Sequence, residues 1–288
     1  LKKALPQSGN SQADILIEMT EEGGITRIMA LYQDITGVGT IGTIRSTREY
    51  FLSLAMGLET IHVHAGGEAA ALKDISNNGF KTLSALKISE PFWRDSYRKN
   101  NVGMEHSMYT SSDKLQDYVA SHEGCVPLTH SEGYVSPFQF AEDGTPDGES
   151  ARQVTVTYSS YKNTVFDYDD ASGTYKVSFF TDRPYVDEAA DGAQVEVTNI
   201  LILPAKQWTK ASNVDGGGRQ AYNLGGGTGY YVSGGKWTEI QWQKGDYYST
   251  GIFTDPLVLT NTDGSPLEMN VGKTYICIPG LSQPIDFE

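Results

Sequence analysis

The stretch "ADILIEMTEEGGITRIMALYQ", from Ala13 to Gln33, contains two runs of alternating side chains separated by a glycine turn. Each run places mainly apolar residues on one face, namely Ile15, Ile17 and Met19 in the first and Ile25, Arg27, Met29 and Leu31 in the second. A period of two is typical of a strand, and the "EEGG" segment has turn composition. The stretch therefore predicts a β-hairpin.

Strand-like and helix-like patterns alternate after this hairpin. Ser46 and Glu49 form a capping box that predicts a helix over "TREYFLSLAMGL", and the buried strand "TIHVHA" follows it. A second helix begins with "EAAALKDI", and Ser111 or Ser112 opens a third. This order predicts an α/β layered domain.

The second half of the chain has a different texture. The polar segment "AEDGTPDGESA", residues 141–151, has the composition of a linker. Short alternating strands with turn signals follow, as in "VEVTNILIL" and "KTYICIP". We predict an α+β protein with an N-terminal α/β layered domain over residues 1–145 and a mainly antiparallel β domain over residues 146–288.

The composition excludes several classes of protein. With 22 basic and 36 acidic residues, the net charge of −14 disfavours binding to nucleic acid phosphates. No run approaches the roughly 18 apolar residues that a membrane-spanning helix needs. Cys125 and Cys277 are the only cysteines, without the spacing of a zinc or redox motif, and whether they pair stays open.

Two motifs suggest cofactors but fit them poorly. Gly37, Gly39 and Gly42 match the dinucleotide pattern, yet three residues separate them from the helix, so we expect a connecting loop. His62 and His64 share one face of a strand and lack a third ligand of known position. We therefore expect neither a cofactor nor a bound metal.

The arginines offer more specific chemistry. Arg45 and Arg48 flank the start of a helix behind the glycine loop, and Arg27 lies on an otherwise apolar strand face. Guanidinium groups near helix N-terminal amides can bind phosphate or carboxylate. The equally weighted alternative is internal pairing with nearby carboxylates, which are Glu18, Glu21, Glu22 and Glu49.

Several segments together resemble a known family. In the first half they are "LPQSGNSQADILIE", "EGGITRIMALY", "IGTIRSTREYF", "VHAGGE", "FWRDSYRK" and "MYTS"; in the second half they are "GTGYYVSGGKWTEIQWQK" and "GSPLEMNVGKTYICIP". These stretches resemble the YerB-like family, a group of predicted bacterial lipoproteins classed as a two-part domain of unknown function. The resemblance spans nearly the whole chain.

The resemblance implies a location but no activity. Family members are expected to sit on the extracytoplasmic face of the bacterial cell membrane, held by an N-terminal lipid anchor upstream of the present chain. The order of hairpin, loop, arginine segment and helix is also similar to that of cell-wall glycopolymer transferases that bind polyprenyl pyrophosphates through arginines. That similarity of layout is an analogy only.

Our leading hypothesis is an envelope protein that binds an anionic ligand, such as a phosphorylated envelope glycan or lipid carrier. Arg27, Arg45 and Arg48 would hold the anion. The same cleft would be lined or supported by His64, Arg94, Arg98, Glu18 and Glu22. One alternative is a metal-assisted phosphotransferase or hydrolase acting on pyrophosphate-linked glycans. Another is a noncatalytic scaffold that presents Trp237 and Trp242 to a protein or glycan.

Overall fold

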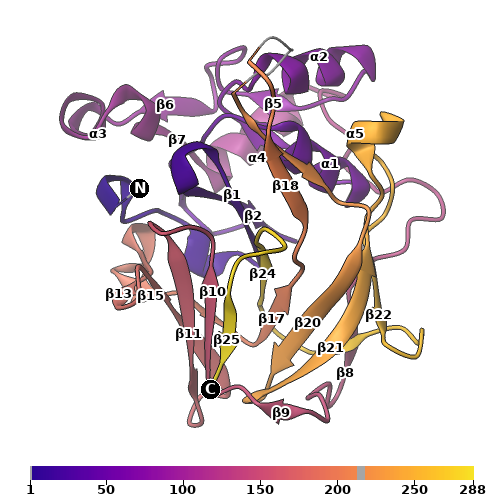
Figure 1. Cartoon of the computed structure of the whole chain (residues 1–288). Coiled ribbons are helices and arrows are strands. Elements are labelled where there is room, and N and C mark those ends of the chain that lie inside the picture. The colour runs from indigo at the N-terminus through magenta and orange to yellow at the C-terminus, as the bar shows by residue number, and fades with distance from the viewer. Residues whose placement is uncertain (1, 213–217) are drawn as a thin grey trace.

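The N-terminal hairpin belongs to a sheet that the second half of the chain completes (Figure 1). This computed structural model describes residues 2–212 and 218–288. In spatial order the strands of this main sheet are β2 (Thr26–Leu31), β1 (Ile15–Thr20), β24 (Thr274–Ile278), β17 (Asn199–Ile202), β20 (Gly227–Ser233), β21 (Lys236–Gln243) and β22 (Val258–Asn261), with β9 (Glu149–Ser150) pairing with β21.

The main sheet is mixed. β1 pairs antiparallel with β2 and parallel with β24, so that Leu16 lies opposite Tyr275. β24 also runs parallel to β17, whereas β17, β20, β21 and β22 are each antiparallel to the next strand in this order. This order places β2 at an edge of the sheet.

A second sheet packs against the main one. Its strands are β13 (Arg183–Pro184), β12 (Thr174–Phe179), β11 (Asn163–Asp169), β10 (Gln153–Thr157) and β25 (Ile285–Phe287), with β16 (Glu196–Val197) pairing with β12. Smaller groups are β3 (Thr40–Gly42) with β7 (Met108–Ser111) and β6 (Phe92–Arg94), β4 (Val63–His64) with β5 (Leu83–Ser84), β8 (Gln139–Ala141) with β23 (Glu268–Asn270), β14 (Val186–Asp187) with β15 (Ala193–Gln194), and β18 (Lys206–Thr209) with β19 (Gln220–Asn223).

Helices cover the other face of the main sheet (Figure 1). They are α1 (Glu49–Gly57), α2 (Ala69–Asn77) and α5 (Tyr247–Thr250), whereas α3 (Ser96–Asn101) follows β6 and α4 (Ser112–Ser121) packs in a separate core with β6 and β7. The 3-10 turns are η1 (Lys2–Ala4), η2 (Asn10–Gln12), η3 (Glu22–Gly24), η4 (Met104–His106) and η5 (Glu188–Ala190). In the described segments no helix is long and apolar enough to cross a membrane.

Strand alternation in the main sheet separates the two cores on its faces, and a third, smaller core lies around Phe92, Met108 and Leu115. On β1, Ile17 and Met19 face the helical layer, where they meet Tyr50 and Leu54 of α1. Leu16 faces the second sheet. Successive strand residues point to opposite faces, so one short strand supplies both cores. The protein is thus three layers: helices, main sheet and second sheet.

A buried ion pair joins β1 to the second sheet. Glu18 is fully buried, and its Oε1 lies 2.9 Å from Nζ of Lys162. Its Oε2 accepts hydrogen bonds from Oγ1 of Thr164 at 2.7 Å and from the hydroxyl of Tyr275 at 2.8 Å. Burial acts to raise the pKa of Glu18, but Lys162 and these hydrogen bonds outweigh burial and hold the pKa below its usual value.

These elements confirm the predicted α+β class and the hairpin, and Ser111 caps α4 as expected. Helix α1 begins later than predicted: its N-cap is Arg48, because the Ser46 hydroxyl donates to the Ala65 carbonyl instead of capping. The domain boundary at residue 145 stays a prediction. The main sheet takes strands from both sides of it.

Replacing Lys162 should test the buried pair. We expect Lys162→Met to lower the free energy of unfolding by about 3–5 kcal/mol, because it leaves the Glu18 charge buried without its cation. Urea denaturation measures this change. The double variant Glu18→Gln/Lys162→Met should recover part of the loss, since it removes both charges.

Lys176→Met is the matched control. Lys176 pairs with Asp169 on the surface, and its loss should cost less than about 1 kcal/mol. Equal destabilisation by the two lysine variants would contradict a structural role for the buried pair.

Candidate functional site

The arginine segment runs in extended form from β3 to α1. The Ile44 amide donates to the Met108 carbonyl at 2.7 Å, and the Thr47 amide donates to the Gly66 carbonyl at 2.9 Å. The Arg45 carbonyl accepts from the Ala65 amide at 2.9 Å. These bonds on both sides fix the backbone from which Arg45 and Arg48 project.

Two of the three predicted anion-binding arginines are neutralised inside the protein. Oε2 of Glu21 lies 3.1 Å from Nη2 of Arg27 and 3.1 Å from Nη2 of Arg48. Arg48 also binds Glu22, with Nη2 at 3.0 Å from Oε2. The side chains of Glu21 and Arg48 are only 1% and 6% exposed. The expected clamp of three available guanidinium groups is therefore not formed, and internal pairing holds for Arg27 and Arg48.

Glu22, which we predicted to orient the arginines, forms hydrogen bonds and an ion pair with Arg48. Its partial burial acts to raise its pKa, but the hydrogen bond and charge of Arg48 lower that pKa to about 2. Arg219 adds a further contact to Oε2 of Glu22 at 3.5 Å. Glu22 therefore stays ionised and holds Arg48 in place across the physiological pH range.

Arg45 differs from these two arginines. It is half-buried, and its Nη1 lies 2.8 Å from Nδ1 of His106. Within residues 2–212 and 218–288, no carboxylate lies within 4 Å of it. An arginine can only donate, so Nδ1 accepts and the His106 proton sits on Nε2. Burial, followed by the charge of Arg45, lowers the pKa of His106 to about 4.

The remaining predicted site residues have other partners. Both ring nitrogens of His64 are bonded, to the Gly66 carbonyl at 2.7 Å and to Oγ1 of Thr82 at 3.0 Å. Arg94 donates to the Met104 carbonyl at 2.7 Å. Arg98 is buried against the Ala4 carbonyl at 3.0 Å and Glu188 at 3.1 Å. Glu18 pairs with Lys162 and contacts none of the arginines, so it does not orient them.

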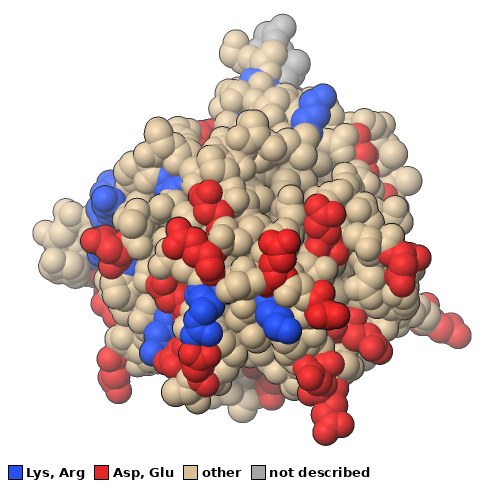
Figure 2. All heavy atoms as spheres, turned by 60° about the horizontal axis from the view of Figure 1, so that its bottom comes forward, with Lys and Arg blue, Asp and Glu red and all other residues tan. Residues whose placement is uncertain are grey.

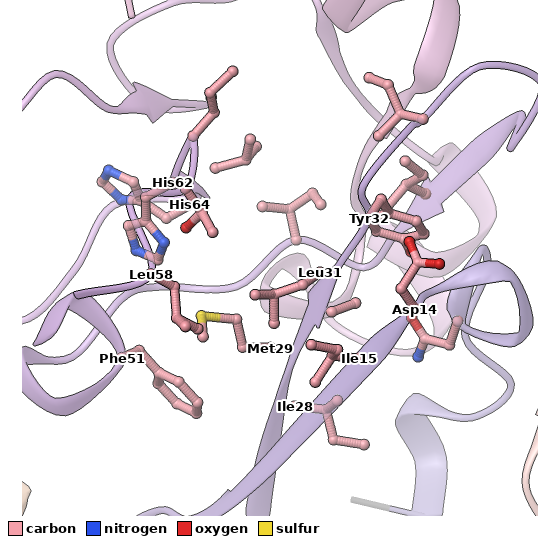
Figure 3. Close-up of a pocket in the computed structure, with 18 of the residues that line it drawn as sticks. Asp14, Ile15, Ile28, Met29, Leu31, Tyr32, Phe51, Leu58, His62 and His64 are labelled. Carbon is pink, nitrogen blue, oxygen red and sulfur yellow. The ribbon is translucent and has the colours of Figure 1, made fainter. Parts of the chain in front are cut away.

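A large cavity lies beside the edge strand β2. Its volume is about 1240 Å³, and Arg45, Arg27 and His64 line it, whereas Arg48, Arg94 and Arg98 do not. Figure 3 shows His62, His64, Leu58 and Phe51 on one side of Met29 and Leu31, with Tyr32 and Asp14 on the other. The cavity is thus mainly apolar, and Arg27 and Arg45 contribute guanidinium groups to its lining.

Apolar side chains also form the rim of the cavity. Leu128, Phe140 and Val271 line it and are 70%, 49% and 74% exposed. Sequence reasoning missed these residues and the wall formed by Met29 and Leu31. The available signal was that both faces of "ITRIMALY" are apolar, but no local pattern shows that this strand lies at a sheet edge.

The described residues contain no group of three or more histidine, cysteine or acidic side chains placed to hold a metal ion. The rings of His62 and His64 stack with their centroids 5.2 Å apart. Nε2 of His62 bonds to Oγ1 of Thr47 at 2.8 Å. The pair is therefore accounted for by stacking and hydrogen bonds within the fold. Cys125 and Cys277 are both unpaired thiols.

Comparisons with known proteins find the same family in both halves of the chain. Residues 1–125 match the family described as "Protein of unknown function (DUF3048) N-terminal domain", and residues 154–276 match its C-terminal domain. "Putative lipoprotein YerB" of Bacillus subtilis (strain 168) is 29% identical over 281 residues, 96% of this chain and 77% of that protein. The crystal structure of YerB from Bacillus subtilis matches 99% of this chain and 90% of that one, with a TM-score of 0.78 and 29% identity.

Replacing Arg48 and replacing Arg45 should have different effects on the free energy of unfolding. Arg48→Gln should lower the free energy of unfolding by about 3 kcal/mol, because Glu21 loses one of its two buried cations. Arg45→Gln should change it by less than about 1 kcal/mol, since only one bond to a neutral ring is lost. Urea denaturation of both variants measures the difference, and a larger loss for Arg45→Gln would contradict the assignment.

The low pKa of His106 predicts a dependence on pH. The folded-state pKa is about 4 and the ordinary value is 6.5, so the unfolded chain binds more protons between these values. Stability should therefore fall as the pH drops through this window. Thermal midpoints measured from pH 7 to 4 should fall less steeply for His106→Gln than for the parent protein. Parallel curves would exclude His106 as a contributor.

Proposed function

This chain belongs to the DUF3048 family of proteins of unknown function, and from that premise we propose that it binds an anionic ligand on the extracytoplasmic face of the cell membrane. The similar YerB protein carries the name of a lipoprotein, which supports a lipid anchor and a place in the cell envelope. The proposed site is the cavity beside β2.

The observation that carries the proposal is the state of Arg45. Its guanidinium lines the cavity without a carboxylate within 4 Å in the described chain, whereas the carboxylates of Glu21 and Glu22 bind Arg27 and Arg48. Burial, followed by the charge of Arg27, acts to lower the pKa of Arg45 and outweighs the opposing charges of Glu105 and Glu21, so a bound anion would stabilise the charged guanidinium. Arginine also binds phosphate and carboxylate with two parallel hydrogen bonds.

The surface elsewhere makes such a site distinctive. The net charge is −14, and Figure 2 shows Asp and Glu side chains spread over one face with a few Lys and Arg among them. An anion is repelled by such a field unless a local cation compensates. A recessed arginine beside apolar walls is therefore the kind of place where an anionic ligand can bind.

The walls restrict the ligand further. The apolar side chains of Met29 and Leu31 line the same cavity as Arg27 and Arg45, with the nearly buried Phe51 and Leu58 behind them. We infer a ligand with one anionic group and apolar groups that contact these walls. Burial of apolar area contributes roughly 25 cal/mol per Å², so these walls would supply much of the affinity.

Binding is better supported than the two alternatives. A metal-assisted phosphotransferase or hydrolase would use the same arginine site to bind the phosphate, and there Arg27 and Arg48 are held by carboxylates. A scaffold presenting Trp237 and Trp242 would need both rings at the surface. Trp242 is 4% exposed, and Trp237 stacks on Phe287 with centroids 4.4 Å apart.

Decyl phosphate and decanol form a probe pair that isolates the anionic group. We expect decyl phosphate to bind about tenfold or more tightly than decanol, and Arg45→Gln to remove most of that difference, because a charge-assisted hydrogen bond is worth about 1.5–3 kcal/mol. Isothermal titration calorimetry below the micellar concentration measures both affinities.

Arg152→Gln is the matched control, since Arg152 is exposed and pairs with Asp170 away from the cavity. It should leave both affinities unchanged. Equal affinities of the parent protein for decyl phosphate and decanol would contradict the proposal.

A further inference from the structure

Every second residue of the edge strand β2 directs its backbone amide and carbonyl toward the cavity. The Glu21 amide donates to the Ile25 carbonyl at 2.7 Å, and the Thr274 amide donates to the Asp14 carbonyl at 2.9 Å. Even-numbered residues of β1 therefore face β24, and odd-numbered residues face β2. In an antiparallel pair the bonded residues alternate along both strands. It follows that Arg27, Met29 and Leu31 bond to β1, whereas Thr26, Ile28 and Ala30 face outward.

These outward groups lack protein partners. No hydrogen bond from another described segment reaches the backbone amide or carbonyl of Thr26, Ile28 or Ala30. Proteins usually protect such edges with lysine, proline or a bulge. β2 contains no lysine or proline, and the Arg27 side chain is turned toward Glu21 and the Ser46 carbonyl. The edge is therefore ready to pair with another strand.

The cavity follows this edge on both faces of the strand. Met29 and Leu31 line it on the helical side, together with Phe51. Ile28 and Tyr32 line it on the side of the second sheet, together with Phe179, Phe180 and Tyr185. A strand laid against β2 would place alternate side chains into these two apolar regions.

We propose that the ligand is an extended peptide segment that adds to β2 as a further strand, with a carboxylate at Arg45. The proposal rests on the proposed function in one respect, the anionic group beside Arg45. The strand pairing stands on a separate observation, the unpaired backbone of Thr26, Ile28 and Ala30.

Charges at the two ends of β2 set the direction of the peptide. Arg45 lies at the end near Arg27, next to Ser46. At the other end Asp14 and Asp34 line the cavity, and neither forms an ion pair with a described residue. A peptide with its carboxylate at Arg45 and its ammonium near Asp14 and Asp34 runs antiparallel to β2. β2 has six residues, so a hexapeptide matches its length.

The test begins with a library of hexapeptides that have free termini, screened against the parent protein by fluorescence polarisation. The tightest binder is then N-methylated at each residue in turn. We expect methylation at every second residue to weaken binding about tenfold or more, because those amides donate to β2, and methylation at the residues between to have less than about a twofold effect. A library without a binder, or a scan without this alternation, overturns the strand pairing.

Two protein variants check the same point. Ala30→Pro removes an outward amide and adds bulk at the edge while sparing the bonds to β1, so it should abolish binding. Ala30→Val adds similar bulk in the side chain and keeps the amide, so it should bind within about threefold of the parent. Thermal midpoints establish that both variants fold, and binding retained by a folded Ala30→Pro overturns the proposal.

The C-terminal carboxamide of the same peptide separates this proposal from the proposed function. Alternation in the methyl scan with equal binding of acid and amide would keep the strand pairing and remove the role of Arg45. Loss of binding by the amide without alternation would keep Arg45 and overturn the strand pairing.

Discussion

The architecture depends on the pairing of β1 with β24, which joins one end of the chain to the other. The parallel register of Leu16 with Tyr275 brings the N-terminal hairpin into the sheet of the second half. It also leaves β2 at the edge and places Glu18 opposite Lys162. The cavity exists because no strand covers β2 on its outer side.

The carboxylates of Glu21 and Glu22 in the hairpin turn determine which arginine is available. Glu21 lies in the turn of the hairpin and contacts both Arg27 and Arg48 through one oxygen. Its pKa is raised by burial even though both cations act to lower it, which indicates how completely the contact is removed from water. Arg45 lies on the same segment as Arg48 but points toward His106.

Much of the fold could be predicted from local patterns, and most of the site could not. The alternation in β1 and β2 and the Ser111 cap each depend on residues that are close together in the sequence, so both were predictable. The pairing of Leu16 with Tyr275 joins segments that are far apart in the sequence, and no local sequence pattern indicates it. Arg27, Arg45 and Arg48 look alike in sequence, and only the positions of Glu21 and Glu22 in the folded chain distinguish them. The sequence around Leu128 and Val271, which form the rim of the cavity, has the composition of an ordinary loop.

The place of β1 in the sheet also constrains how the chain matures. Synthesis runs from the N-terminus, so β1 leaves the ribosome long before β24, its neighbour in the sheet. Until β24 arrives, β1 lacks its neighbour on one side, so Leu16 and Ile17 are not yet fully buried. The native sheet closes only when nearly the whole chain has been made, and nascent chains must keep these apolar residues from premature association until then.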